Sequence, residues 1–317
     1  MTTGATTGLA PAAGLGTHTR AADYWELLKP RIMLLIVVTT VGSLALAAGG
    51  WPGSALVLWT VLGMMLVSGG SSAINHWYDR DIDALMARTS ARPVASGRVP
   101  PAAALTFGLV LGAAGVGVLA LRVHWLAAVW AVAGFLCYVL VYTVWLKRRT
   151  PQNIVIGGAA GAVPPLVAWA AVDGSVSATA VALFAVVFLW TPPHFWALAL
   201  LLEEDYSRAG VPMLPSVRGS KVSAQQILVY TVLLVAASLV PVVLGTLGIV
   251  YAVAAAVLGG RFIWLARRLL RSPDDRVAAR RTFLYSLLYL ALVFVAMGGD
   301  SALGQPGAAS GIRRRGA

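Results

Sequence analysis

Three side chains spaced four residues apart could hold a metal ion on one side of a helix. Asn75, Asp79 and Asp83 follow a long apolar run, and they share one helix face if residues 73–84 are helical. Neighbours on such a stripe have Cβ atoms roughly 5–6 Å apart, which lets two carboxylates share divalent cations. Because no other cation lies on that face of the helix, the stripe predicts a metal site with these three residues as ligands.

The arginines that follow the stripe predict what binds together with the metal. Arg88 and Arg92 lie in the loop directly after it, and arginine binds phosphate through paired hydrogen bonds. A diphosphate satisfies both the metal and the arginines. The simpler alternative is that the acids are solvated or paired with arginines at a membrane surface. For Asp81, on the opposite side of the helix, a pair with Arg80 or Arg88 is the favoured interpretation.

A second polar group closes another apolar run. Glu203, Glu204 and Asp205 end it, and carboxylates from two helices could bind Mg²⁺ ions that bridge a diphosphate. Capping and solvation are the alternative for the two glutamates.

Within the same run, the double proline 192–193 is expected to open the helix and to leave His194 near membrane depth, as a candidate site residue. Its alternative is a neutral histidine bonded to a carbonyl that the prolines free.

The composition places these residues in a membrane protein. The chain has 317 residues, 59% hydrophobic and only 11% charged, whereas soluble domains carry about 25% charged residues. The basic residues behind the net charge of +12 lie in short loops between apolar segments, which indicates membrane topology and not nucleic-acid binding. The single cysteine, Cys137, excludes an intramolecular disulfide, and the Cys/His spacings of zinc sites are absent.

Nine apolar segments are long enough to cross a bilayer, at about 20 residues each. They are residues 32–49, 55–74, 102–121, 125–145, 153–172, 179–201, 226–244, 247–265 and 282–298. Prolines inside them, at 164, 165, 192, 193 and 241, predict kinks. We therefore expect an all-α, polytopic membrane protein with a single transmembrane domain at 23–298. The tails 1–22 and 299–317 are expected to be disordered, with His18 solvated.

The distribution of positive charge predicts the orientation. With the N-terminus inside and nine crossings, all but four of the 24 lysines and arginines lie on the inner side. The four exceptions are Arg122, Arg313, Arg314 and Arg315. This bias predicts a cytoplasmic N-terminus, in the plasma membrane of a bacterium. It also places three polar loops on the cytoplasmic face, at 75–98, 147–149 and 203–221. Lys147 and Arg148, in the second loop, are further candidates for binding a diphosphate.

Five ordered stretches make the chain resemble the UbiA-type intramembrane prenyltransferases, and most closely the branch that farnesylates haem. The stretches are Lys29-Pro30-Arg31, Asp79 to Pro93, Thr150 to Gly158, Trp190 to Trp196 and Asp205 to Pro215. The stripe of Asn75, Asp79 and Asp83 is similar to the first aspartate motif of that family. A lone N-x-x-x-D-x-x-x-D would be a weak signal, but five ordered matches over about residues 24–298 are specific.

The resemblance implies a bundle of nine spans around a central cavity. It also implies transfer of the farnesyl group of farnesyl diphosphate to the C2 vinyl group of haem b, giving haem O, with Mg²⁺ required. Downstream partners would be a haem A synthase or oxidase assembly proteins. The second motif of the family is D-x-x-x-D, and Asp205 matches its last position. Leu201 stands where the first aspartate belongs, so Glu203 or Glu204 would supply the missing oxygen ligand.

The sequence identifies the residues that would bind haem less clearly than those that would bind metal and diphosphate. His194 is the main candidate for an iron ligand or orienting group, His76 is its rival, and His124 is expected to be interfacial. Aromatic rings would shield and stabilise a farnesyl cation, because their faces attract positive charge. The candidates are Tyr138, Tyr142, Trp190 and Trp196.

Three other functions are compatible with parts of this pattern. A prenyltransferase of the same superfamily could act on a quinone precursor or a tetrapyrrole alcohol. A membrane transporter also carries prolines and acids within its spans. Against it, the chain has no internal repeat and its acids cluster at one face. A non-enzymatic haem carrier would not need the stripe of Asn75, Asp79 and Asp83.

Overall fold

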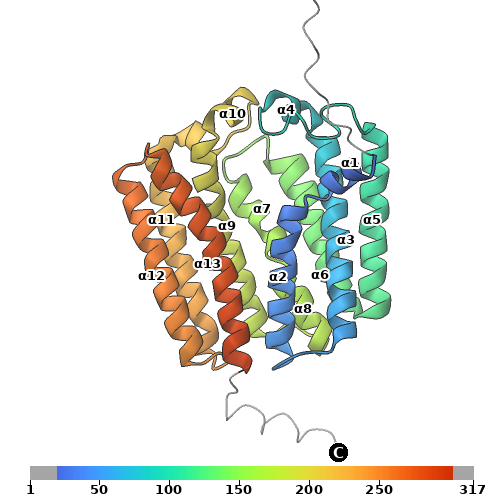
Figure 1. Ribbon diagram of the computed structural model, residues 1–317, viewed down its shortest axis with the longest axis vertical. Helices are drawn as coiled ribbons and strands as arrows, with labels where there is room; N and C mark the ends of the chain where they lie inside the picture. Colours follow the sequence, from blue (N-terminus) through green and yellow to red (C-terminus); the bar gives the residue numbers. More distant parts are fainter. Residues whose placement is uncertain (1–19, 303–317) are drawn as a thin grey trace, which may run out of the picture.

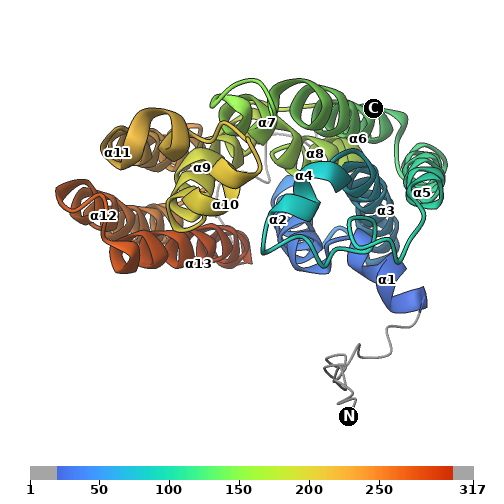
Figure 2. The same cartoon turned by 90° about the horizontal axis from the view of Figure 1, so that it is seen from above.

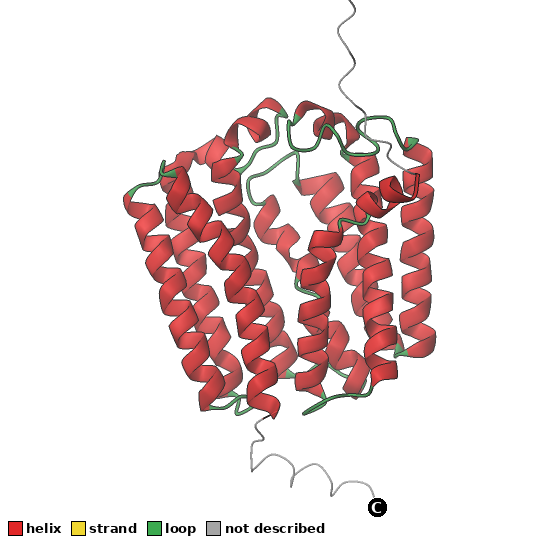
Figure 3. Cartoon of the chain, in the orientation of Figure 1, coloured by secondary structure: helices red, strands yellow, loops and turns green. Residues whose placement is uncertain are grey.

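The computed structural model describes residues 20–302, and in that part of the chain every regular element is a helix (Figures 1 and 3), as predicted. The elements are α1 (Arg20–Leu27), α2 (Pro30–Ala47), α3 (Ser54–Tyr78), α4 (Arg80–Leu85), α5 (Pro101–Arg122), α6 (Trp125–Leu136), the π-helix η1 (Cys137–Leu146), α7 (Asn153–Gly161), α8 (Pro164–Asp173), α9 (Ala178–Leu201), α10 (Glu203–Arg208), α11 (Leu214–Val243), α12 (Ile249–Arg271) and α13 (Arg276–Ala302). Helix thus extends a few residues into both predicted tails. The rest of those tails, with His18, lies outside the described residues.

The described residues contain eight units long and apolar enough to span a membrane. They are α3, α5, α6 with η1, α7 with α8, α9, α11, α12 and α13. The number rises to nine if α1 and α2 form one broken span. Each of the nine predicted segments falls on one of these units, so the prediction of a polytopic helical membrane protein is confirmed. The central cavity stays a prediction.

Two proline pairs in these spans have different consequences. Pro164 and Pro165 occupy the first turn of α8, and the span breaks just before them, as predicted. Pro192 and Pro193 lie inside α9, which continues from Ala178 to Leu201, so the prediction that they open the helix is wrong. Proline removes backbone hydrogen bonds, but α9 is packed against α7, α8, α11 and α13, which hold its backbone in place.

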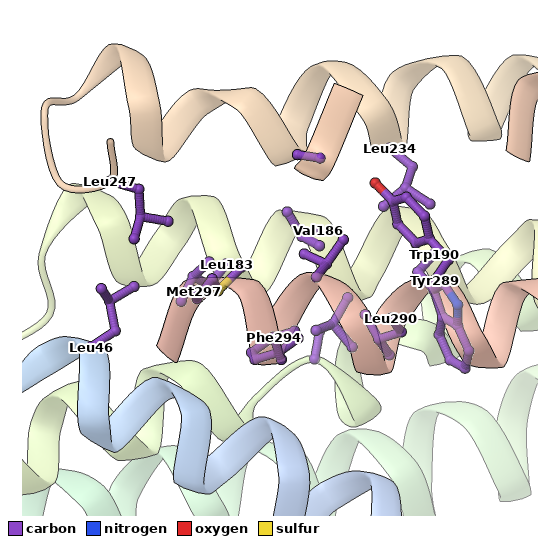
Figure 4. Close-up of a cluster of buried hydrophobic side chains, with 14 of the residues drawn as sticks. Leu46, Leu183, Val186, Trp190, Leu234, Leu247, Tyr289, Leu290, Phe294 and Met297 are labelled. Carbon is purple, nitrogen blue, oxygen red and sulfur yellow. The ribbon is translucent and has the colours of Figure 1, made fainter. Parts of the chain in front are cut away.

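The largest apolar core lies between α9, α11, α12 and α13 and reaches α2 (Figure 4). Leu183, Trp190, Leu234, Tyr289 and Phe294 are among its buried side chains. Helices in lipid gain little from the hydrophobic effect, because lipid tails are as apolar as leucine, so close packing holds them together. This half of the bundle is therefore a packed scaffold.

Glycines let α3 pack directly on α5. A Cβ atom on Gly70 would lie 2.5 Å from the carbonyl oxygen of Gly108, and one on Gly108 would lie 2.7 Å from that of Gly70. Small residues permit this close approach in pairs of membrane helices. The contact fixes the last part of α3, which carries Asn75 and His76.

The short helices α4 and α10 lie at the same end of the bundle (Figure 1), and Figure 2 shows them from that end. Because α4 follows α3 and α10 follows α9, the polar loops at 75–98 and 203–221 share this end, as predicted. We call it the polar-loop end. It collects the residues that could do chemistry.

Candidate functional site

The predicted stripe is carried by α3 and α4, with a break at Asp79. α3 ends immediately before this residue and α4 starts immediately after it, so the single helix predicted over 73–84 is interrupted. The backbone still advances through helical hydrogen bonds, from the N–H of Asp79 to Asn75 (2.9 Å) and from the N–H of Asp83 to Asp79 (2.8 Å). The three side chains are exposed by 2%, 0% and 2% along the stripe, and the Asn75 amide donates to Oδ2 of Asp79 at 2.6 Å.

Cations from outside the stripe's own helix contact these carboxylates, so the expectation that no cation lies on that face is wrong. Lys147, directly after η1, donates to Oδ2 of Asp79. Nη1 of Arg92 donates to both carboxylate oxygens of Asp83, at 2.8 and 2.7 Å. Buried carboxylates are stable when they are paired in this way, because an unpaired buried charge is strongly unfavourable.

Lys29 is a site residue to which the sequence assigned no role of its own, although Lys29-Pro30-Arg31 is one of the five stretches that resemble the family. Its Nζ donates to Oδ1 of Asn75 at 2.7 Å and to the hydroxyl of Tyr138 at 3.3 Å. Its φ of 54° is the only positive value of a non-glycine residue in the described part of the chain. Such a conformation is unfavourable for a residue with a Cβ atom and often marks a functional site. The signals in the sequence were its place before Pro30, where α2 begins, and its membership of that stretch.

Asp81 pairs with Arg148, and not with Arg80 or Arg88. Nη1 and Nη2 of Arg148 donate to its two carboxylate oxygens at 2.6 and 2.7 Å. These forked hydrogen bonds lower the pKa of Asp81 and raise the pKa of Arg148. Nη2 of Arg148 also lies 3.7 Å from Oδ1 of Asp79. Arg148 therefore bridges the exposed and the buried sides of α4, while Arg88 is exposed.

The π-helix η1 places polar side chains against α3. Thr143 accepts a hydrogen bond from Nδ2 of Asn75 at 3.1 Å and donates to the carbonyl oxygen of Tyr138 at 2.8 Å. The N–H of Lys147 bonds to the carbonyl of Tyr142, five residues earlier, at 2.9 Å. Short π-helical segments are frequent at functional sites. Here the segment brings Tyr138, Thr143 and Lys147 to the side of α3 that carries Asn75.

The first acidic segment is Asn75, Asp79 and Asp83, and the second is Glu203, Glu204 and Asp205. Asp205 contacts the loop that follows the first segment, whereas Glu204 is exposed. Oδ1 of Asp205 accepts a hydrogen bond from the N–H of Ala87 at 3.4 Å and lies 3.8 Å from Nη1 of Arg208. Ala87 follows Asp83 by four residues, so α10 touches the loop after α4. The structure therefore brings Asp205 to the loop after the first segment, and the roles of Asp205 and Glu204 as metal ligands stay predictions.

The donor atoms at the stripe fit a divalent cation, with one condition. Oδ1 of Asp79 is buried and accepts no hydrogen bond, which leaves a carboxylate oxygen of the kind that Mg²⁺ prefers. Within residues 20–302, however, no three His, Cys, Asp or Glu side chains converge closely enough to hold one ion. Because Lys147 and Arg92 neutralise Asp79 and Asp83, a metal would require these cations to move to another anion.

The two histidines proposed for a haem lie in different surroundings. Nδ1 of His194 lies 2.7 Å from Oγ of Ser286 on α13. Its ring stacks against Trp190 and Phe283, with centroid distances of 4.3 and 4.9 Å. His76 is 2% exposed, and neither of its ring nitrogens has a hydrogen-bond partner. The His194 ring is thus held in place by its neighbours, whereas the buried His76 ring has no hydrogen-bond partner.

The four aromatic candidates also lie in two different surroundings. The rings of Tyr138 and Tyr142 lie 5.4 Å apart on η1, next to the acidic stripe. Trp190 and Trp196 instead belong to apolar clusters on α9. His124, expected at an interface, caps α6 at the end of the bundle opposite the polar loops, where Nδ1 accepts a hydrogen bond from the N–H of Leu126 at 3.1 Å.

Fold and site together define a multi-pass helical membrane protein with a buried group of acids and cations at one end. The model of the UbiA prenyltransferase family matches residues 35–288. The chain belongs to the UbiA prenyltransferase family, which confirms the expected class of enzyme.

Several relatives that are about 50% identical in sequence to this chain are named protoheme IX farnesyltransferase. The chain is 50% identical over 279 residues to the protoheme IX farnesyltransferase of Gloeobacter violaceus, with 88% of this chain and 92% of the relative covered. It is 47% identical to that of Parvibaculum lavamentivorans, with 94% of each chain covered. It is 51% identical to that of a Roseiflexus species over 88% of this chain, but it spans only 52% of that relative's length.

Solved structures agree with the fold. A structure of digeranylgeranylglyceryl phosphate synthase superposes with a TM-score of 0.75 at 21% identity, covering 90% of this chain and 99% of that one. A UbiA homolog from Archaeoglobus fulgidus bound to DMAPP and Mg²⁺ superposes with a TM-score of 0.61 at 16% identity, covering 87% and 99%. The UbiA fold is therefore confirmed.

Proposed function

We propose that this chain transfers the farnesyl group of farnesyl diphosphate to the C2 vinyl group of haem b, giving haem O, with Mg²⁺ as cofactor. The observation that carries the proposal is the buried group of Asp79, Asp83, Lys147 and Arg92, in which acids and cations meet at one end of an apolar bundle. The similarity to protoheme IX farnesyltransferases supports haem b as the acceptor.

The cations of this group can bind a diphosphate. Lys29, Arg92 and Lys147 come from three segments and each already holds a polar group of the stripe. A diphosphate would accept hydrogen bonds from these side chains and stabilise them away from the carboxylates. Arg88 and Arg148, at the exposed edge of the group, would complete the anion site.

Transfer of these cations would free the acidic oxygens for Mg²⁺. The ligands would be Asn75, Asp79 and Asp83 from the first segment, with Asp205 and then Glu204 from the second. Bound there, Mg²⁺ would neutralise the charge on the departing diphosphate. The structure of the A. fulgidus homolog with DMAPP and Mg²⁺ supports this combination of ligands.

The apolar bundle suits the carbon chemistry. The allylic C–O bond of farnesyl diphosphate breaks, and farnesyl C1 forms a C–C bond to the haem vinyl group. A water molecule then adds to the resulting cation as a hydroxyl group and releases one proton. The faces of Tyr138 and Tyr142, beside the stripe, attract the positive charge, and the surrounding spans exclude bulk water.

His194 is our candidate for contact with the haem, and His76 is the rival. Because Nδ1 of His194 is engaged with Ser286, Nε2 is the nitrogen left for an iron or a propionate. His194→Ala is expected to weaken haem b binding, followed by spectral titration, more than farnesyl diphosphate binding. Equal losses for the two substrates would remove the haem-side role. The same titration of His76→Ala separates the two candidates.

We also propose that the polar-loop end faces the cytoplasm of a bacterial plasma membrane, with the N-terminus on the same side. Support comes from the excess of lysine and arginine at that end. A single cysteine introduced at Arg149, in a variant whose native Cys137 is replaced by alanine, should react with a membrane-impermeant thiol reagent only in inside-out vesicles. Reaction only in right-side-out vesicles would reverse the orientation.

The decisive experiment is pigment extraction. Membranes that contain the chain, incubated with haem b, farnesyl diphosphate and Mg²⁺, should form haem O, and membranes without the chain should not. Removal of Mg²⁺ by a chelator should stop the reaction. Prenylation of an aromatic acid in place of haem b would instead support the quinone-precursor alternative.

A further inference from the structure

Two arginines and a tryptophan form a ladder on α12, far from the acidic stripe in sequence. Arg261, Trp264 and Arg268 are all exposed, and their spacing of three and four residues places them on one helix face. The guanidinium carbons of Arg261 and Arg268 lie 4.7 and 6.0 Å from the centroid of the Trp264 ring. We call these three residues the arginine ladder.

The two guanidinium groups of the ladder are not neutralised by the protein. The ion pairs found between residues 20 and 302 involve neither of them. The nearest acids in sequence lie in the turn after α12. There Asp275 accepts hydrogen bonds from the N–H groups of Val277 and Ala278 and so caps α13, and Asp274 is exposed. The ladder therefore keeps its positive charge.

The position of Arg261 along α12 makes that charge unusual. α12 begins at Ile249, so Arg261 lies about 18 Å from that end at 1.5 Å per residue, inside a hydrocarbon layer of about 30 Å. Only 33% of the apolar stretch of this span is buried, so much of its surface faces lipid. A charged side chain at this depth extends toward the headgroups, here toward Arg268 and the polar-loop end.

We propose that the arginine ladder binds the phosphate of an anionic phospholipid in the leaflet at the polar-loop end. Two guanidinium groups on one stripe can both donate hydrogen bonds to phosphate oxygens, and the Trp264 ring, 48% exposed, lies close to both of them. The apolar surface of α12 offers a place for the acyl chains. Further arginines at the same end add attraction for an anionic leaflet: Arg267, Arg271, Arg276, Arg280 and Arg281.

The test is titration of the purified full-length chain with single lipids, followed by native mass spectrometry. The chain should bind phosphatidylglycerol about tenfold (about 1.4 kcal/mol) more tightly than phosphatidylcholine, because two unneutralised guanidinium groups lie where an anionic headgroup would bind. The double variant Arg261→Gln/Arg268→Gln should lose this preference. Arg267→Gln, at an exposed arginine of the same helix outside the ladder, removes only general attraction for the leaflet and should reduce the preference by no more than about twofold.

Three outcomes would overturn the proposal. They are equal affinity for the two lipids, an unchanged preference in the double variant, and an equal loss in Arg267→Gln. Inorganic phosphate is the arm that tests for a free anion, and displacement of the lipid at millimolar phosphate would assign the site to phosphate itself. If the double variant does not fold, Arg268→Gln alone should still weaken phosphatidylglycerol binding about threefold, and no change there would equally reject the ladder.

Discussion

The first and second acidic segments of this protein differ in how much structure surrounds them. Asp79 and Asp83 are 0% and 2% exposed, and each carboxylate contacts a cation: Asp79 contacts Lys147, 68 residues away, and Asp83 contacts Arg92 in the following loop. Asp205 has a side chain that is 14% exposed, with one hydrogen bond of 3.4 Å and an arginine at 3.8 Å. Glu204 is exposed on α10.

This difference indicates that the fold itself pairs the carboxylates of the first segment, and we infer that those of the second segment remain available to a bound ligand. Two buried carboxylates are stable only with their partners, so Lys147 and Arg92 must be in place in the folded protein without a ligand. Asp205 and Glu204 keep access to water and need no such partner. Variants in the first segment should therefore have large effects, and those in the second smaller ones.

Asp79→Asn should have the largest effect on activity. The change removes a buried charge, leaves Lys147 unpaired and deletes a proposed metal ligand, so we expect a loss of about 10³-fold in kcat or more. The measurement is haem O formed per amount of membrane-inserted protein. Asp81→Asn is the matched control, because its pair with Arg148 is exposed, and it should lose less than about tenfold. An active, Mg²⁺-dependent Asp79→Asn variant would contradict the role of the first segment.

Arg92→Gln should come next. Asp83 would lose both of its hydrogen bonds to Nη1, and the diphosphate would lose one cation, so we expect a loss of about 10²-fold in kcat/KM for farnesyl diphosphate. Arg98→Gln is the matched arginine of the same loop. It pairs with Asp23 at 2.7 Å and should lower thermal stability with little change in KM. Equal changes in KM for both variants would count against a diphosphate contact by Arg92.

Contacts between residues that are close in sequence could be predicted, whereas contacts between residues far apart in sequence could not. The stripe of Asn75, Asp79 and Asp83 follows from spacing alone, because helix neighbours are local in sequence. Lys147 was predicted to bind a diphosphate, but its pairing with Asp79 joins residues 68 positions apart, and no local rule reports such a contact. The pair of Asp81 with Arg148 was missed for the same reason. The sequence predicted Arg80 or Arg88 as its partner, both of which are closer in sequence.

The helices show the same limit. Apolar length predicted the spans, because a membrane requires about 20 apolar residues of each. The break at Asp79, the π-helix at Cys137–Leu146 and the continuity of α9 through Pro192 and Pro193 depend on packing against neighbouring helices. The contact of Lys29 with Asn75 was not predicted, because it joins distant residues and involves a left-handed backbone conformation that is rare outside glycine.

Asp205→Asn should have an intermediate effect. Asp205 is partly buried, and its hydrogen bond from the N–H of Ala87 is long at 3.4 Å, so its carboxylate is weakly held and available to a bound ligand. We expect about a tenfold loss in kcat/KM, with a higher Mg²⁺ requirement and unchanged thermal stability without substrate. The measurement is activity against Mg²⁺ concentration. A loss as large as that of Asp79→Asn would show that the second segment is as essential as the first.

Glu204→Gln should have the smallest effect and tests the comparison most finely. An exposed carboxylate holds no partner that its loss could leave unpaired, and water can replace it as a metal ligand. We therefore expect activity within about threefold of the original chain, with a slight rise in the Mg²⁺ requirement. Haem O formation at limiting and saturating Mg²⁺ separates these two effects. A loss above about tenfold at saturating Mg²⁺ would mean that Glu204 turns inward when the substrate binds. Binding would then require α10 to move from the position that it has in this structure.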